Sequence, residues 1–308
     1  MRIKVLGSAA GGGFPQWNCA CVNCRGLRQG TLRGKARSQA QLAVSSDGKA
    51  WFLLNASPDL CTQIEATPEL QPTAGTRHSP IAGIVLSSGD LDNVLGLLLL
   101  REFQPLRIYS TAAIREIVSQ DNSFFRLLER VPDQVTWTEF RPGSVFELKS
   151  GGRAGASVCC RALALPGSYP AYVKDSEHRR LAGDEAVLAL AVESGGAKML
   201  FAPALSAITD ELQRAIADCD LLFADGTFWS DDELQQTRGG GPTAREMGHL
   251  PVGGKGGSLE RLAALNGPRK MYIHINNTNP MLNEESPQHR EAREAGWEIA
   301  EDGWEFEL

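Results

Sequence analysis

The spacing of apolar residues changes along the chain and predicts strands first, then strands that alternate with helices. Residues 39–54 carry two apolar runs on either side of Asp47-Gly48, which is the pattern of a β-hairpin with a tight turn. Residues 81–86 form a short apolar run typical of a buried strand. After a turn at 87–90, residues 91–102 have the apolar spacing of a helix. The first part of the chain therefore predicts a hairpin followed by a strand, loop and helix unit.

The rest of the chain continues this alternation. Helices are predicted over 111–120, from 209 to about Cys219, and over 258–265, where Gly267-Pro268 ends the helix. We expect strands at 134–140, 144–148, 157–165, 186–193, 198–202, 221–224 and 270–275, and a final helix followed by a hairpin around Asp302-Gly303. Elements in this order predict one α/β domain over 1–308, with two sheets and helices outside them.

Composition narrows the possible functions. The chain has 308 residues, 42% of them hydrophobic and 22% charged, with a net charge of -6 and no block of Lys and Arg, so no nucleic-acid partner is expected. The longest apolar run, 94–100, is far shorter than the ~20 residues that span a bilayer, and the N-terminus resembles a strand more than a signal peptide. We expect a cytoplasmic protein without a membrane partner, and a homodimer is compatible with the sequence.

Three cysteines crowd into six residues, Cys19, Cys21 and Cys24, beside the Gly-rich segment 11–13. Thiolates favour zinc, and a flexible loop can direct three of them toward one tetrahedral centre. The alternative is three free buried thiols. The sequence predicts a structural zinc site in a loop at about 7–30, with a fourth ligand from elsewhere.

Two other segments carry candidate chemistry. Asp90 and Asp92 lie on the turn after the strand at 81–86, where loops at a sheet edge often supply metal ligands, although an Asp at a helix start is also a common N-cap. His274 ends a predicted strand and precedes the polar run 276–279, so it is either a ligand or base, or a satisfied core histidine. Met247-Gly248-His249 and Asp225-Gly226-Thr227 are suggestive in the same way.

Several segments together resemble the coenzyme PQQ biosynthesis protein B family over nearly the whole chain. They are 7–18 leading into the cysteines, 55–59, 96–102, 247–249 and 274–280. The resemblance implies the metallo-β-lactamase fold, an αββα sandwich of two mixed sheets with a metal site at one edge. It also implies a role in making pyrroloquinoline quinone (PQQ), as an iron-dependent enzyme that uses O2 to hydroxylate the tyrosine ring of a Glu-Tyr precursor cut from a small peptide.

The resemblance also implies roles for individual residues. Asp92 and His274 would bind the edge metal, with Asp90 as a third candidate. Asn93 stands where the family usually keeps a histidine, and an amide is a poor substitute for an imidazole. His249 matches a proton donor of related phosphodiesterases and Asp225 ends the strand beside it, so both are predicted to be catalytic. Asn277 matches the residue that completes the three-cysteine site in one such family.

The Asn93 substitution keeps other functions open. A weakened edge site suits a protein that binds or carries the precursor or the finished quinone. Hydrolysis of another small substrate by a metal-activated water is the usual chemistry of the implied fold. Metal content and turnover with Fe(II) distinguish these alternatives from the hydroxylase.

Overall fold

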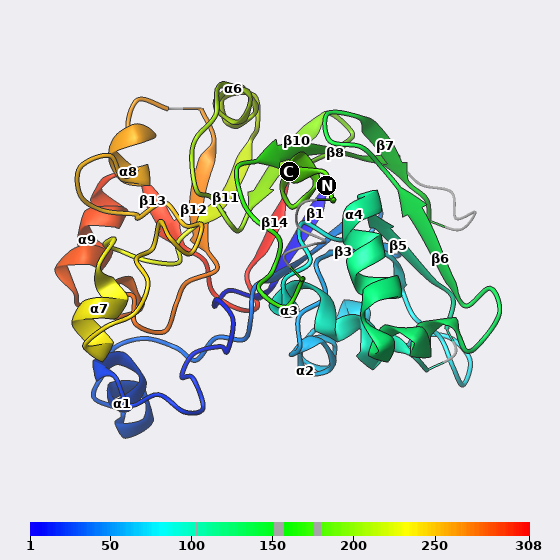
Figure 1. Cartoon of the computed structure of the whole chain (residues 1–308), viewed down its shortest axis with the longest axis horizontal. Helices are drawn as coiled ribbons and strands as arrows, with labels where there is room; N and C mark the ends of the chain where they lie inside the picture. The colour runs from blue at the N-terminus through cyan, green and yellow to red at the C-terminus, as the bar shows by residue number, and fades with distance from the viewer. Residues whose placement is uncertain (103, 151–156, 175–179, 266) are drawn as a thin grey trace. The chain divides into compact units, whose positions relative to one another are not determined.

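The computed structural model describes residues 1–102, 104–150, 157–174, 180–265 and 267–308 (Figure 1). They fall into two compact units, each assembled from segments far apart in the sequence. The first unit comprises 1–6, 41–198 and 303–308, and the second comprises 7–40 and 199–302. The expectation of one domain over 1–308 stays a prediction. In the described part of the chain, no helix has both the length and the apolar character to cross a membrane.

The first unit contains a seven-stranded mixed sheet in the order β14-β1-β2-β3-β4-β5-β6. Its strands are β1 Arg2–Gly7, β2 Gln41–Ser45, β3 Trp51–Leu54, β4 Ile81–Val85, β5 Leu106–Ser110, β6 Val135–Glu139 and β14 Glu305–Glu307. β2 and β3 are antiparallel, which confirms the hairpin, and Gly48 adopts the positive φ of 71° that its turn needs. β3 to β6 are parallel, and β3 is buried along its whole length, as expected of a continuous apolar run.

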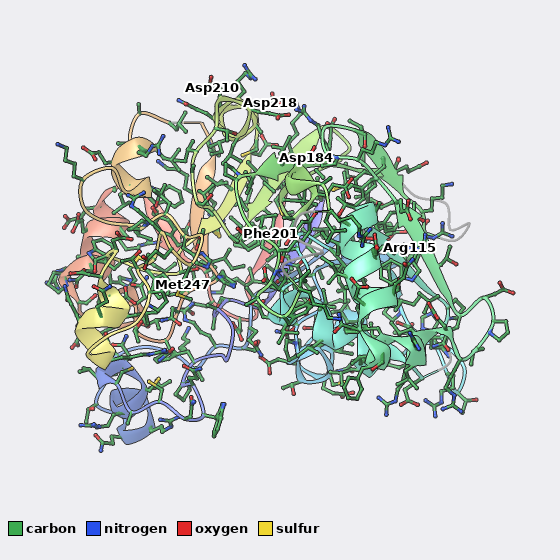
Figure 2. The ribbon with its side chains drawn as sticks, viewed as in Figure 1. Arg115, Asp184, Phe201, Asp210, Asp218 and Met247 are labelled. Atoms are coloured by element: carbon green, nitrogen blue, oxygen red, sulfur yellow. The ribbon has the colours of Figure 1, made fainter. Side chains whose placement is uncertain are left out.

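Other elements of the first unit are β7 Val145–Leu148, β8 Val158–Leu165, β9 Val187–Ser194, α2 Leu60–Glu65, α3 Leu91–Val94, α4 Ala112–Arg115 and the short helical segments Pro68–Leu70, Leu95–Leu100, Glu116–Asp121, Ser123–Glu129 and Gly183–Glu185. β7, β8 and β9 are antiparallel neighbours. Arg115, labelled in Figure 2, joins α4 to β6 through an ion pair with Glu139 at 2.6 Å.

The helix predicted over 91–102 is α-helical only in its first turn and continues as a 3-10 helix. The cause is a long-range backbone contact. Ala56 donates its N–H to the carbonyl of Asn93 at 2.7 Å, and its own carbonyl accepts the N–H of Gly96 at 2.9 Å. A Cβ at position 96 would lie 2.3 Å from the carbonyl oxygen of Ser57, so this approach requires glycine.

The second unit contains four parallel strands and the helices around them. The strands are β10 Ala197–Ala202, β11 Leu221–Asp225, β12 Arg269–Ile273 and β13 Trp297–Ile299, and the helices are α1 Val22–Gln29, α6 Asp210–Ala217, α7 Glu233–Arg238, α8 Ser258–Arg261, α9 Pro287–Glu294 and the 3-10 turn Pro280–Leu282. Thr209 caps α6 by accepting from the Leu212 amide at 3.1 Å. Figure 2 labels Asp210 in the first turn of α6 and Asp218 at its carboxyl end. The carboxyl ends of parallel strands meet at one edge, where sites form in such sheets.

The predicted terminal hairpin around Asp302-Gly303 is wrong. β13 pairs in parallel with β12, whereas β14 pairs antiparallel with β1. The turn is present, but Trp297 stacks on Tyr272 of β12 with ring centroids 4.0 Å apart, which holds β13 in its own sheet. A turn signal between two short apolar runs does not identify their partners.

Candidate metal centres

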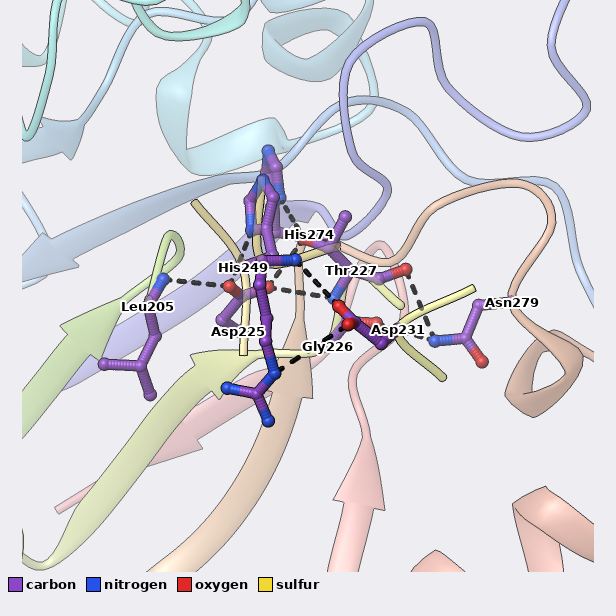
Figure 3. A network of polar contacts seen from close by, with 9 residues as sticks. Leu205, Asp225, Gly226, Thr227, Asp231, His249, His274 and Asn279 are labelled. Atoms are coloured by element: carbon purple, nitrogen blue, oxygen red, sulfur yellow. Dashed lines mark hydrogen bonds and ion pairs between the residues drawn. The ribbon is translucent and has the colours of Figure 1, made fainter. Parts of the chain in front are cut away.

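Asp225, His249 and His274 gather in the second unit where its parallel strands end (Figure 3). Asp225 is the last residue of β11, His274 directly follows β12, and His249 lies in the loop between α7 and α8. Their candidate ligand atoms lie within 4.8 Å of one another. Two imidazoles and a carboxylate form a donor set that suits divalent transition metals, so the residues fit a metal centre.

The Asp225 carboxylate is buried and makes four hydrogen bonds. Its Oδ1 accepts from the Thr227 amide at 2.9 Å and from the Thr227 hydroxyl at 2.6 Å. Its Oδ2 accepts from the Leu205 amide at 2.8 Å and lies 2.7 Å from Nδ1 of His249 (Figure 3). Burial alone would raise the pKa of this carboxyl, but His249 and the hydrogen bonds outweigh burial and lower the pKa. Because both oxygens are engaged, Asp225 is placed to orient a metal-binding histidine from behind.

His274 is held in a costly backbone conformation. Its φ is 58°, in the left-handed region that a residue other than glycine adopts at a cost of order 1 kcal/mol. Its Nδ1 lies 2.8 Å from the Thr227 hydroxyl, and its ring lies nearly parallel to that of His249, with centroids 5.6 Å apart and an angle of 22°. Backbone strain of this kind collects at functional sites, where the surroundings hold it in place.

The three cysteines also come together, in the same unit. Cys21 is the N-cap of α1, and its sulfur accepts the Cys24 amide at 3.5 Å, while the sulfur of Cys19 accepts the Cys21 amide at 3.4 Å. The three sulfurs lie within 4.8 Å of one another. A set of thiols at this spacing fits a zinc ion.

The side chain of Asn277 contacts all three sulfurs. Its side-chain amide nitrogen lies 3.1 Å from the sulfur of Cys19, 3.7 Å from that of Cys21 and 3.4 Å from that of Cys24. Asn23 on α1 donates to the backbone carbonyls of Asn277 and Asn279, which fixes the loop against the helix. Asn277 thus lies beside all three sulfurs, and its predicted role as the fourth ligand would require Oδ1 to face the cation after rotation of the amide.

The thiols of this cluster differ in acidity. Burial raises the pKa of the Cys24 thiol to about 11. At Cys19 burial also acts to raise the pKa, but hydrogen bonds from the backbone and side chain of Cys21 outweigh it and lower the pKa. A cation bound between the sulfurs would favour the thiolate at all three positions.

The loop at 87–93 belongs to the first unit and is organised by hydrogen bonds among its own side chains. The hydroxyl of Ser88 donates to Asp90 Oδ2 at 2.6 Å and accepts the Asn93 side-chain amide at 2.8 Å. Asp90 occupies the N-cap position of α3 but makes no capping bond, and Asn55 Oδ1 accepts the Ser87 amide at 2.9 Å. The loop contains neither His nor Cys, so carboxylates and amides are its candidate metal donors.

Glu233 at the start of α7 is a buried carboxyl beside the loop that carries Asn277. It accepts the hydroxyl of Thr278 and, at 2.6 Å, the amide of Trp229. Burial raises its pKa from 4.5 to about 7. The folded protein therefore takes up a proton at Glu233 at a pH where the unfolded chain has already lost it.

We expect Glu233→Gln to flatten the pH dependence of stability between about pH 4.5 and pH 7. A raised carboxyl pKa means that the free energy of unfolding falls as pH rises from 4.5 through about 7, by about 3 kcal/mol at most, and glutamine cannot titrate. Urea unfolding across this range measures the slope, with the exposed Glu246→Gln as control. Equal slopes for the wild type and Glu233→Gln would contradict the assignment.

Relatives match this chain over almost its entire length. Coenzyme PQQ synthesis protein B of Rhizobium meliloti (strain 1021) is 43% identical over 309 residues, covering 100% of this chain and 98% of the relative. The protein of the same name from Methylobacterium sp. (strain 4-46) is 40% identical over 303 residues, covering 98% of each. This chain belongs to the coenzyme PQQ synthesis protein B family. A Beta-lactamase superfamily domain profile also matches residues 50–275.

Solved structures agree with this family. Zn(2+)-bound PqqB from Methylobacterium extorquens is 38% identical to this chain with a TM-score of 0.92, and the match covers 100% of both chains. A diphosphatase of the PhnP family, 19% identical and with a TM-score of 0.66 over 100% of this chain and 97% of its own, shares the fold. The predicted metallo-β-lactamase fold, with two mixed sheets and flanking helices, is confirmed.

Within this family member, the structure brings some predicted site residues together. In the second unit, His274 lies with His249 and Asp225, and Asn277 lies with the three cysteines. Asp90, Asp92 and Asn93 lie in the first unit, where Asp90 and Asn93 both bond to the Ser88 hydroxyl. Their roles as ligands or catalytic groups stay predictions. Thr227 and Glu233 were not predicted as site residues. The run Asp225-Gly226-Thr227 after a buried strand was the available signal for Thr227, and Glu233 had none.

Proposed function

We propose that this chain acts in PQQ synthesis as a metal-dependent enzyme whose metal is held by the cluster of Asp225, His249 and His274. The observation that carries the proposal is the buried carboxylate with two imidazoles, all within 4.8 Å, in a member of this family. We assign the two imidazoles as the metal donors, and Oδ2 of Asp225, which lies 2.7 Å from Nδ1 of His249, as the group that orients that ring.

The chemistry of the donors separates two metals. The thiol cluster of Cys19, Cys21 and Cys24 suits zinc, with Asn277 as the fourth ligand, and this zinc is structural. The imidazole nitrogens of His249 and His274 suit Fe(II), which leaves the remaining metal positions for substrate, O2 or water. The Zn(2+)-bound PqqB structure supports zinc in this family.

We assign the reaction as hydroxylation of the tyrosine ring of a Glu-Tyr precursor. Bound iron would supply activation of O2. In the balanced reaction a ring C–H bond is replaced by C–OH with one oxygen atom of O2, and the other oxygen atom leaves as water, which takes two electrons from an added reductant and two protons from solvent. His249 and His274 keep the metal in place. Asp225, buried and hydrogen-bonded four times, keeps the imidazoles aligned through the cycle.

Loading the purified protein with Fe(II) under argon, then adding Glu-Tyr, ascorbate and 18O2, tests this function. We expect one labelled oxygen atom per hydroxylated ring by mass spectrometry, and no product when zinc replaces iron. His289→Ala, whose imidazole lies on α9 outside the cluster, should leave turnover unchanged. Tight peptide binding without product would instead favour a carrier, and a cleaved peptide bond would favour a hydrolase.

A further inference from the structure

One hydroxyl group, that of Thr227, lies between Asp225 and His274. Its oxygen is 2.6 Å from Oδ1 of Asp225, 2.9 Å from the carbonyl oxygen of His274 and 2.8 Å from Nδ1 of the same histidine (Figure 3). A threonine hydroxyl has a single hydrogen to donate and can accept through its lone pairs. The three contacts therefore cannot all be donations by the threonine.

The chemistry of the three neighbours decides the direction of each hydrogen bond. A carboxylate oxygen and a carbonyl oxygen can only accept a hydrogen bond. If the threonine hydroxyl donated to Nδ1, both of these oxygens would face the lone pairs of the threonine oxygen. One of the two oxygens must therefore receive the hydroxyl hydrogen. The carboxylate is the stronger acceptor and the shorter contact. The threonine oxygen must then accept a hydrogen from Nδ1 of His274, which places the proton of the neutral ring on Nδ1 and the lone pair on Nε2.

The same carboxylate determines the proton position on the second imidazole. Oδ2 of Asp225 lies 2.7 Å from Nδ1 of His249 and can only accept there, so His249 also carries its proton on Nδ1. Asp225 therefore sets one histidine directly and the other through a hydroxyl. Both rings present the Nε2 lone pair, the form in which an imidazole binds a metal.

The backbone holds Thr227 in this position. Its amide donates to Asp225 Oδ1 at 2.9 Å, and its carbonyl accepts the Asn276 amide at 3.0 Å. Gly226 donates to the carbonyl of Ile273 at 2.8 Å, and a Cβ on Gly226 would lie 2.8 Å from that of Tyr272. The segment after β11 is thus bound closely to the end of β12, so the hydroxyl has little freedom to leave His274.

We propose that Thr227 is a positioning residue that relays Asp225 to His274 and fixes the Nδ1–H tautomer of that imidazole, so that Nε2 is its metal-binding atom. The metal-binding part of this inference rests on the proposed function, whereas the tautomer does not. The proposal requires a hydroxyl at position 227. Serine at this position should therefore keep the same tautomer of His274, whereas valine, which has nearly the shape of threonine but no hydroxyl, should not.

Long-range 15N–1H NMR of the histidines in iron-free protein tests the tautomer directly. We expect Nδ1–H at His274 in the wild type and in Thr227→Ser, and a mixture or Nε2–H in Thr227→Val, while His249 keeps Nδ1–H in all three. Wild-type protein with Nε2–H at His274 would overturn the proposal, and so would Thr227→Val with an unchanged His274. The wild-type spectrum decides even if the valine variant does not fold.

Titration with Fe(II) gives the second measurement. Loss of an oriented histidine partner typically lowers metal affinity by 10-fold to 100-fold, so we expect a weakening of about this size in Thr227→Val and recovery in Thr227→Ser. Retained zinc in both variants would show that the cysteine cluster is intact. If the wild type has the expected tautomer at His274 but binds no iron, the proposed function fails and the role of Thr227 stands. If the wild type has the other tautomer but normal turnover, the role of Thr227 fails and the proposed function stands.

Discussion

Replacing Cys24 with serine is expected to remove the zinc of the cysteine cluster, from about one ion per chain to nearly none. Cys24 is fully buried, its sulfur lies within 4.8 Å of the other two, and a hydroxyl is a much harder and weaker zinc ligand than a thiolate. The loss should also lower the unfolding temperature, because zinc binding contributes to folding when the ligands come from segments far apart, as Asn277 and the cysteines do. Elemental analysis per chain and thermal unfolding measure both effects.

Cys61→Ser is the matched control, since Cys61 is exposed on α2 and outside the cluster. It should retain zinc and the wild-type unfolding temperature. Iron bound by the Asp225 cluster should persist in Cys24→Ser wherever the protein stays folded, which would separate the two centres. Full zinc content in Cys24→Ser would show that these thiols are not the zinc ligands.

Features decided by neighbouring residues were predictable from the sequence. The hairpin over 39–54 follows from the turn chemistry of Asp47-Gly48, and Gly48 has the positive φ that this turn demands. The proximity of Cys19, Cys21 and Cys24 follows from their spacing, because α1 starts between them. Local preference and final structure agree at these positions.

Features decided by distant contacts were not predictable in the same way. Asp225, His249 and His274 each have a suggestive neighbourhood, but β11 and β12 must lie in parallel before they can meet. The role of Thr227 depends on the distances from its hydroxyl to Asp225 and to His274, which is 47 positions away in the sequence. The change to a 3-10 helix after Val94 and the separate partners of β13 and β14 also arise from backbone contacts that no local pattern specifies.

Polar side chains of the loop at 87–93 are hydrogen-bonded to one another, that of Asn93 included. A neutral amide at position 93 accepts no proton and binds metals weakly, but it donates to Ser88, which in turn donates to Asp90. The amide nitrogen of Asn93 therefore has a hydrogen-bond partner within the loop.

Asp225→Asn is expected to weaken iron binding by 10-fold to 100-fold and to abolish most turnover. The two carboxylate oxygens accept four hydrogen bonds, two each. An amide nitrogen in place of Oδ1 would face the amide and hydroxyl of Thr227, and one in place of Oδ2 would face Leu205 and His249. Unpaired buried donors should cost about 1–3 kcal/mol in the free energy of unfolding. Fe(II) titration, urea unfolding and the oxygen-incorporation assay measure the three effects.

Asp231→Asn provides the control, because Asp231 is half-exposed and accepts the Arg245 amide at 3.0 Å outside the cluster (Figure 3). It should keep iron affinity, stability and turnover close to those of the wild type. Histidine NMR then identifies the cause in Asp225→Asn, since both His249 and His274 should lose their fixed tautomers together, whereas Thr227→Val disturbs His274 alone. If Asp225→Asn binds iron as tightly as the wild type and keeps both tautomers, Asp225 does not organise the centre, and the two imidazoles must be oriented by the backbone around them.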